Sequence, residues 1–373
     1  MAHSEILIIG GGLSGLINAI LLRKAGFEVR LLEKKRYPFH RVCGEYISNE
    51  VIPFLQAHDL YPDHLAPPEI TKFQLTSVSG RAAHMDLDLG AFGVSRYALD
   101  AYWVEKAKAL GVVIQEGTTV SEVAFKEDTF RIKSRKGDSY EADWVIGAFG
   151  KRSIVDKHLN REFMTRRSPY IGVKYHLYID EPEDQIALHN FAGGYCGISQ
   201  IEEGKYNLCY LSHRDNLREH GNIEQMEAAI LHQNPYLKRI FHEGEFLWEK
   251  PEVINEISFE PKKAVEQHVL MSGDAAGLIT PLCGNGMALA IHSAKILSET
   301  LIQYGQSGTS NRLQVEEVYT QAWNGLFSRR LWAGRQIQRL FGSPRLSDWA
   351  VDIARNVGPV ANFLMKNTHG QPF

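Results

Sequence analysis

The chain has 373 residues and a formal net charge of −3, with 41 Lys and Arg against 44 Asp and Glu. This balance gives no general attraction to nucleic acid, so we expect no nucleic-acid partner. No segment has the roughly 20 apolar residues that span a bilayer, and the four cysteines lack metal-ligand spacing. We therefore expect a cytoplasmic protein of two joined lobes without a metal site.

The first 33 residues predict a dinucleotide-binding βαβ unit. An apolar strand over 6–9 enters a glycine-rich turn, an apolar helix follows, and a second strand ends at Glu33. Gly10 permits the tight turn, Gly12 lets the backbone approach a pyrophosphate, and Gly15 lets the helix pack on the sheet. The helix N-terminus attracts phosphates, and Glu33 can accept from a ribose hydroxyl. This unit alone leaves open whether the nucleotide is FAD or NAD.

Regular and irregular segments alternate after this unit. The stretch 36–45 is polar, aromatic and too irregular for a helix or strand, so we interpret it as a functional loop. Hydrophobic periodicity then predicts a strand-like region at 73–89, a helix at 96–110, a strand at 112–114, an antiparallel meander over 118–134 and a strand at 144–148.

A second lobe and a return to the first lobe are predicted further along the chain. Strands of alternating aromatic and aliphatic residues fill 170–212, with glycine-containing turns between them. An apolar strand at 269–274 and a helix at 285–301 then bring the chain back to the first lobe. The C-terminal remainder has a largely helical pattern.

The return segment carries a second set of residues suited to a cofactor. Asp274 stands at a strand end, and Asn285 lies in a glycine-rich helix start eleven residues later (285 − 274 = 11). The carboxylate can accept from ribityl or ribose hydroxyls, and the helix dipole can stabilise negative charge on a reduced isoalloxazine. An enzyme that binds only NAD would have little use for this second set of cofactor residues, so the pattern favours FAD.

These residues together resemble a known group of flavoproteins. The chain is similar to proteins that share a fold with p-hydroxybenzoate hydroxylase, and most closely to their geranylgeranyl reductase-like group. The resemblance rests on the glycine turn with Glu33, on the Arg-x-Cys-Gly-Glu stretch 41–45, on Arg96 with Asp100, and on 273–287. It implies that Arg41 and Arg96 approach the FAD ribityl or pyrophosphate, the Val120 backbone the adenine, and Asp274 the ribityl chain. The residues expected at FAD are Gly10, Gly12, Leu13, Ser14, Gly15, Glu33, Arg41, Arg96, Val120, Asp274, Gly284, Asn285, Gly286 and Met287.

The chain also departs from these relatives at identifiable positions. Gly277 stands where aromatic hydroxylases of this fold usually have His, which favours the reductase-like group. The stretch 193–198 resembles a degraded form of that group's Tyr-x-Trp-x-Phe-Pro segment, and Phe149 stands where the family usually has Asp. The Trp-x-Trp-x-Ile-Pro segment of flavin halogenases is absent from the sequence.

The expected fold class is α/β with an α+β second lobe. We expect a Rossmann-like FAD-binding domain at 1–72, 94–168 and 262–305. An antiparallel-sheet substrate domain is interleaved at 73–93 and 169–261, and a C-terminal helical segment follows at 306–373. Within that segment, 326–341 has the spacing of an amphipathic helix. Such a helix either packs on the protein or contacts a membrane surface peripherally.

The function expected from these features is that of an FAD-dependent oxidoreductase. Its leading form is C=C reduction of an apolar, lipid-like or polyketide-like small molecule by hydride from N5 of the reduced flavin. The alternatives are an FAD-dependent monooxygenase that hydroxylates an aromatic substrate, and a non-catalytic flavin electron-transfer protein. NAD(P)H or an electron-donor protein would reduce the flavin. Pocket candidates are Tyr170, Tyr195, Tyr210 and Cys43; no catalytic acid is selected, although His40 is the histidine to test as one.

Overall fold

A computed structural model describes residues 5–280, 285–305, 311–338, 347–348, 351–352, 355 and 370–373. Its first sheet, sheet A, has the order β17-β18-β10-β1-β2-β6, and its strands are parallel except for β17. The central strands β10 and β1 are almost entirely apolar and buried because both faces of the sheet are covered. The strands of sheet A are β1 (Glu5–Ile9), β2 (Glu28–Glu33), β6 (Val113–Glu116), β10 (Trp144–Gly147), β17 (Val265–Glu266) and β18 (Val269–Met271).

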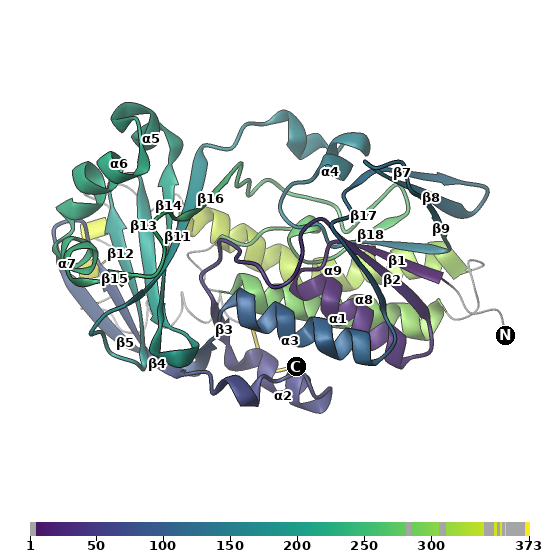
Figure 1. The fold of residues 1–373 in the computed structure, drawn as a ribbon, viewed down its shortest axis with the longest axis horizontal. Coiled ribbons are helices and arrows are strands. Elements are labelled where there is room, and N and C mark those ends of the chain that lie inside the picture. The colour runs from purple at the N-terminus through teal and green to yellow at the C-terminus, as the bar shows by residue number, and fades with distance from the viewer. Residues whose placement is uncertain are drawn as a thin grey trace.

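Helices cover one face of sheet A and a small sheet lies on the other side (Figure 1). Asn18 on α1 accepts from Ser298 on α8 at 2.9 Å, so a buried polar contact joins these two helices. The helices are α1 (Leu13–Lys24), α3 (Arg96–Ala109) and α8 (Gly286–Tyr304), with the short α2 (Ile52–Ala57) and α4 (Ile154–His158) at the periphery. The small sheet comprises β7 (Val120–Lys126), β8 (Thr129–Ser134) and β9 (Ser139–Ala142).

The second sheet, sheet B, has the order β15-β11-β14-β13-β12-β4-β5-β3, and β16 also pairs with β11. Three helices lie on its side away from sheet A (Figure 1). Its strands are β3 (Tyr46–Ser48), β4 (Glu69–Thr76), β5 (Ala82–Gly93), β11 (Tyr170–Tyr178), β12 (Gln185–Phe191), β13 (Gly194–Gln200), β14 (Tyr206–His213), β15 (Glu245–Phe246) and β16 (Glu252–Asn255); the helices are α5 (Arg214–His220), α6 (Ile223–Ile230) and α7 (Pro235–Glu243).

Each face of sheet B has its own apolar cluster, because successive side chains of a strand point to opposite faces. The far cluster joins Val173 and Leu208 to Met226 and Leu237 of the covering helices. The near cluster contains Leu278, which follows the cofactor-type segment of sheet A. The near face of sheet B is therefore turned toward the first lobe.

The structure refines several expectations from the sequence. The strand-like region at 73–89 is a hairpin of β4 and β5 that begins earlier, at Glu69. The predicted domain boundary at residue 73 falls inside β4, and β3 also pairs in sheet B, so sheet B takes residues from the range assigned to the first domain. The helices at 214–243 were not expected, since their apolar stripes are short and interrupted by polar residues.

The long helix α9 (Arg312–Gln338) packs along the first lobe. Val315, Tyr319, Trp323 and Phe327 recur every four residues and are buried against the core, while Trp332 is exposed. This stripe explains how the helix packs, so membrane contact by 326–341 stays a prediction; residues 339–341 lie outside the described part. Among the described residues, no helix combines the length and the apolar character needed to cross a membrane.

Candidate functional site

The glycines of the first turn are required by close contacts between backbones. Gly10 has φ +103°, and a Cβ on it would lie 2.5 Å from the carbonyl oxygen of Ala148. A Cβ on Gly15 would lie 2.0 Å from the carbonyl oxygen of Gly10. Side chains at either position would separate the strand, the turn and α1, so the turn can form only with glycine.

Glu33 is fixed beside this turn at the end of β2. One carboxylate oxygen accepts the Gly11 N–H at 2.8 Å, and the other accepts the Lys35 N–H at 2.9 Å. The Glu33 carbonyl accepts from Thr118 N at 2.9 Å, which brings the start of β7 at Val120 alongside. The structure thus brings Glu33, the glycine turn and Val120 together, as the sequence predicted for an adenosine-binding edge.

A buried ionic network lies next to the turn. Asp100 accepts from Arg96 at 2.8 and 2.9 Å and from Arg41 at 3.0 Å. Arg41 also donates to the Gly11 carbonyl at 3.1 Å and reaches Glu33 at 3.4 Å. Asp100 therefore holds both predicted cofactor arginines in fixed positions over the turn.

The second cofactor segment is attached to the first through small polar residues. The hydroxyl groups of Ser14 and Ser272 are hydrogen bonded, and Gly273 N donates to Ser293 on α8 at 2.8 Å. Arg161, ion-paired with Asp156 at 2.8 Å, donates to the Ala275 carbonyl at 2.8 Å. These contacts fix the backbone from which the Asp274 side chain projects.

The residues present fit FAD. A Cβ on Gly12 would be in ordinary van der Waals contact with the Arg96 guanidinium at 3.5 Å, so glycine leaves the space next to that cation free of a side chain. Among the described residues, none donates a hydrogen bond to the Asp274 carboxylate, which therefore keeps its acceptor capacity for ligand hydroxyls. Burial raises the pKa of Asp274, although Lys262, Arg96 and Lys151 oppose the shift. A glycine turn beside a cation suits the pyrophosphate of FAD, and a carboxylate with free acceptor capacity suits its ribityl hydroxyl groups.

The start of α8 completes the expected cofactor set. Asn285 is the N-cap residue and Gly286 the first residue of the helix, and Met287 is buried in the core. Leu13 is likewise buried at the start of α1. Gly284 lies outside the described residues. The two helix N-termini thus belong to the two segments that the sequence assigned to FAD.

Two of the predicted pocket tyrosines share the near face of sheet B. Tyr170 and Tyr195 belong to the near cluster with Leu211, Ile257 and Leu278. Tyr210 does not share this face: it lies opposite Val173 in the strand register and packs in the far cluster. Its hydroxyl donates to Glu227 on α6 at 2.7 Å. The expectation that Tyr210 lines the same pocket is therefore corrected.

Cys43 lies in the loop between the lobes. It is partly buried against the core of the first lobe, and burial raises the pKa of its thiol. Asn207 on β14 donates to the carbonyls of Cys43 and Gly44 at 3.2 and 2.8 Å. The loop is thereby attached to the near face of sheet B, and its functional role stays a prediction.

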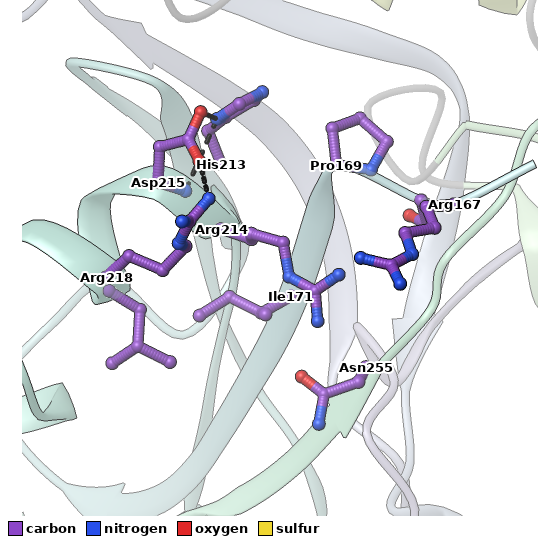
Figure 2. Close-up of a pocket in the computed structure, with 10 residues that line it drawn as sticks. Arg167, Pro169, Ile171, His213, Arg214, Asp215, Arg218 and Asn255 are labelled. Atoms are coloured by element: carbon purple, nitrogen blue, oxygen red, sulfur yellow. Dashed lines mark hydrogen bonds and ion pairs between the residues drawn. The ribbon is translucent and has the colours of Figure 1, made fainter.

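Two cavities lie on either side of the chain segment that leads into β11. The larger has a volume of about 690 Å³ and is lined by the cationic side chains of Arg167, Arg214 and Arg218. Figure 2 shows Asp215 between His213 and Arg218, with a 3.2 Å contact to His213 and an ion pair to Arg218. The smaller, about 400 Å³, reaches members of the near cluster; its wall includes Tyr170, Ile257, Phe259 and Arg335. Only the smaller cavity adjoins the face that is turned toward the cofactor segments.

Several site residues escaped the sequence reasoning. Tyr37 donates to the Gly11 carbonyl at 2.5 Å, and a Cβ on Gly11 would lie 1.8 Å from its oxygen. Lys262 donates to the Asp274 carbonyl at 2.8 Å, and burial lowers its pKa to about 8. Neither residue is part of a local motif. Within the described part of the chain, no cluster of three or more His, Cys, Asp or Glu residues is arranged to hold a metal ion.

Comparison with known proteins agrees with this site. A family model described as an FAD binding domain matches residues 3–315. The chain belongs to this FAD binding domain family, FAD is its cofactor, and it has the fold of FAD-dependent oxidoreductases.

Curated relatives of the chain differ in what they are named for. It is 24% identical over 370 residues to geranylgeranyl diphosphate reductase of Synechocystis, covering 90% of this chain and 85% of that one. It is 22% identical over 362 residues to 3-hydroxybenzoate 6-hydroxylase of Klebsiella oxytoca, covering 90% and 88%. It is 26% identical over 339 residues to conditioned medium factor receptor 1 of Dictyostelium discoideum, covering 80% of this chain but only 63% of that relative's length.

Solved structures agree on the fold. A geranylgeranyl bacteriochlorophyll reductase-like protein of Thermoplasma acidophilum superposes with a TM-score of 0.78 at 18% identity, over 98% of this chain and 96% of that one. The flavin-dependent halogenase CmlS superposes with a TM-score of 0.77 at 19% identity, over 89% of this chain and 64% of that one. Reductases, hydroxylases and halogenases share the fold, so similarity alone does not select the reaction.

Proposed function

We propose that this protein is an FAD-dependent oxidoreductase that reduces a carbon–carbon double bond in an apolar, lipid-like or polyketide-like small molecule. The observation that carries the proposal is the apolar near cluster on the near face of sheet B. Tyr170 and Tyr195 on that face pack in one cluster with Leu278, which is four residues beyond Asp274. A substrate between this face and the cofactor would meet aromatic and aliphatic groups, which favours an apolar molecule.

The cavity of about 400 Å³ is the proposed entry to this site. Its inner wall includes Tyr170, Ile257 and Phe259, all in the near cluster. Arg335 of α9 lies at the same cavity, so the helix covers the route from one side. An apolar molecule that enters here would pass from a charged surface to the apolar wall of the near cluster, where it would displace water.

The protein would hold the cofactor and orient the substrate. When bound, FAD would supply a hydride to the double bond. Arg41, Arg96 and Asp274 are the proposed contacts of its pyrophosphate and ribityl chain, Glu33 of its ribose and the Val120 backbone of its adenine. Tyr170 and Tyr195 are the proposed pocket walls, and either hydroxyl is suited to donate the proton that completes the reduction.

Product analysis under oxygen-18 tests the reaction. The FAD-loaded chain, with NADPH or dithionite as reductant, is incubated with polyunsaturated isoprenoids and unsaturated polyketides under labelled oxygen and under nitrogen. We expect a product that gains two hydrogen atoms, carries no label and also forms under nitrogen. Labelled oxygen in the product would support the aromatic monooxygenase instead. Bound FAD with no substrate-dependent turnover in a broad screen would support an electron-transfer protein.

A further inference from the structure

A triad of buried ionisable side chains lies directly behind the cofactor loop. Glu45 ends the predicted cofactor motif, while Lys174 and His176 project from the near face of β11. Lys174 Nζ is 2.5 Å from one oxygen of Glu45, and His176 Nε2 is 2.6 Å from the other. The side chains of Glu45 and Lys174 are 0% exposed and that of His176 is 4% exposed.

The triad can exist in two charge states. Burial opposes ionisation of Glu45, but Lys174 and His176 outweigh it and hold its pKa below the usual value. The Arg96 N–H also donates to Glu45 at 2.7 Å, so the carboxylate is stabilised from three sides. Ionised Glu45 and charged Lys174 neutralise each other. A neutral His176 thus leaves the triad without net charge, and a protonated His176 gives it one positive charge.

Buried ion pairs seldom add net stability compared with apolar packing, so three such groups at one place call for another role. The position of the triad indicates one. Lys174 donates to the Arg41 carbonyl at 3.2 Å, and Glu45 accepts from the first residue of α3, Arg96. Arg41 and Arg96 are both proposed FAD contacts. The triad is therefore held against the parts of the chain that hold the cofactor.

The surroundings of His176 differ from those of its neighbour His40. Its neighbour His40 lies with ring centroids 5.3 Å apart, and Trp248 covers both rings at 4.4 Å from His40 and 4.7 Å from His176. Burial, with Lys174 and His176, lowers the pKa of His40 to about 4, so His40 is neutral at pH 7. His176, unlike His40, contacts the carboxylate of Glu45 through Nε2.

The remaining ionisable groups near the triad keep a constant charge. Burial raises the pKa of the thiols of Cys43 and Cys209, which stay uncharged at neutral pH. Arg96 remains cationic in its ion pair with Asp100. Lys205, which acts on His40, lies between Glu202 and Glu203, and its pKa is raised. Among the groups of this cluster that the structure describes, these observations leave His176 as the candidate for a response to a change in charge at the cofactor.

We propose that His176 is a charge-compensating proton site for flavin reduction. Two electrons from a reductant such as NAD(P)H, with one proton, convert bound FAD to its anionic reduced form, and His176 binds a second proton at Nε2 or Nδ1. Reoxidation releases this proton. The positive triad offsets the negative charge added to the cofactor and so favours reduction. The inference rests on the FAD binding of the proposed function, but not on which substrate is reduced.

The midpoint potential of the FAD-loaded full chain, measured anaerobically between pH 7 and 8.5, tests this proposal. Uptake of two protons with two electrons lowers the potential by about 59 mV per tenfold fall in proton activity, and uptake of one proton by about 30 mV. We expect the steeper slope for the wild type and the shallower slope for His176→Gln. Equal slopes for the two proteins would overturn the proposal.

A matched control is available on the same sheet. His189 is a buried histidine of β12 that bonds Thr76 at 2.9 Å and stacks on Tyr236, away from the cofactor loop. His189→Gln makes the same chemical change and should keep the wild-type slope. A slope reduced as in His176→Gln would overturn the proposal, because it would make the effect a general one of removing a buried imidazole.

A measurement on the wild type alone guards against a His176 variant that fails to fold. Nitrogen-15 NMR of histidine-labelled protein at pH 7.5 should reveal one imidazole that is neutral in the oxidised protein and protonated after dithionite reduction. Absence of any such change would overturn the proposal while the flavin spectrum still supports FAD binding. A wild-type protein that takes up no FAD would overturn both the proton site and the proposed function.

Discussion

Asp100 accepts two hydrogen bonds, of 2.8 and 2.9 Å, from Arg96, which lies one helical turn earlier on α3. The same carboxylate accepts from Arg41 at 3.0 Å, and its side chain is only 2% exposed. Two guanidinium groups from different parts of the sequence thus depend on one buried anion. This dependence makes Asp100 more informative to change than either arginine.

Asp100→Asn should destabilise the protein and weaken FAD binding. Removing one partner of a buried ion pair costs about 3–5 kcal/mol, because the other charge stays buried without compensation. We expect this loss in the free energy of unfolding measured with urea. The affinity for FAD should fall at least tenfold, which corresponds to about 1.4 kcal/mol. Glu141→Gln, which breaks the exposed pair of Glu141 with Arg131, is the control and should change neither quantity measurably.

Two glycines of the first turn should respond differently to alanine. Gly12 has φ −86°, and its added Cβ would meet Arg96 at 3.5 Å, so Gly12→Ala should keep the stability of the FAD-free chain. It should still lower flavin content, because the Cβ projects into the space proposed for the pyrophosphate. Gly10→Ala should destabilise even the FAD-free chain, since its Cβ would meet backbone at 2.5 Å. Thermal unfolding measures the stability of each variant, and the absorbance of bound flavin measures its FAD content. Equal behaviour of the two variants would contradict the different roles proposed for Gly10 and Gly12.

The stability of the chain should depend on pH through Glu227. Burial raises the pKa of Glu227 to about 7, against the donated hydrogen bonds of Tyr210 and Tyr175. A raised pKa means that the folded state binds the proton more tightly than the unfolded state. The contribution of Glu227 to the free energy of unfolding is therefore complete below about pH 4.5, falls as the pH rises toward 7 and is absent above that.

Glu227→Gln tests this dependence by urea unfolding at pH 5 and pH 8. Between pH 5 and pH 8 the free energy of unfolding of the wild type should fall by up to about 3 kcal/mol more than that of the variant, on the basis of 1.36 kcal/mol per pKa unit. Glu219→Gln on the neighbouring helix α5, a residue at which the side chain is exposed, is the control and should behave as the wild type. Identical pH profiles for the wild type and Glu227→Gln would contradict the raised pKa.

Position 277 should not accept the histidine found in related hydroxylases. A Cβ on Gly277 would lie 2.9 Å from Leu331 and 3.2 Å from Trp323, both on α9. Gly277→His should therefore push α9 away and cost about 1–3 kcal/mol in unfolding of the FAD-free chain. Gly197→Ala, whose Cβ would meet its nearest neighbour at 3.8 Å, should be tolerated. A fully stable Gly277→His variant would show that α9 does not restrict this position.

Local patterns were sufficient for the cofactor side of the site. The glycine turn predicted the contacts at Gly10 and Gly15 because a strand, a tight turn and a helix follow one another within the first 24 residues. Asp274 and the start of α8 were predicted for the same reason, since a strand end and a helix start lie close in sequence. Backbone geometry over short distances restricts the residue type, and so the sequence retains the signal.

The substrate side was less accessible to sequence reasoning. Tyr170 and Tyr210 both lie on strands of sheet B, and alternation alone cannot relate the faces of two separate strands. The register decided the question, because Tyr210 pairs with Val173 and residues directly opposite each other share a face. The helices α5 to α7 that cover this far face were also missed, since tertiary burial rather than local propensity stabilises such short helices.

The sequence by itself determined the dinucleotide turn, the acidic end of β2 and the second cofactor segment at Asp274. Each of these is a short segment whose geometry depends on its own residues. Only the tertiary structure decided the triad. Glu45 lies 131 residues from His176 and 129 from Lys174 along the chain. No local pattern links a loop carboxylate to two alternate residues of a distant strand. Packing sheet B against the first lobe buries all three groups together, and burial turns ordinary side chains into a site that can respond to charge.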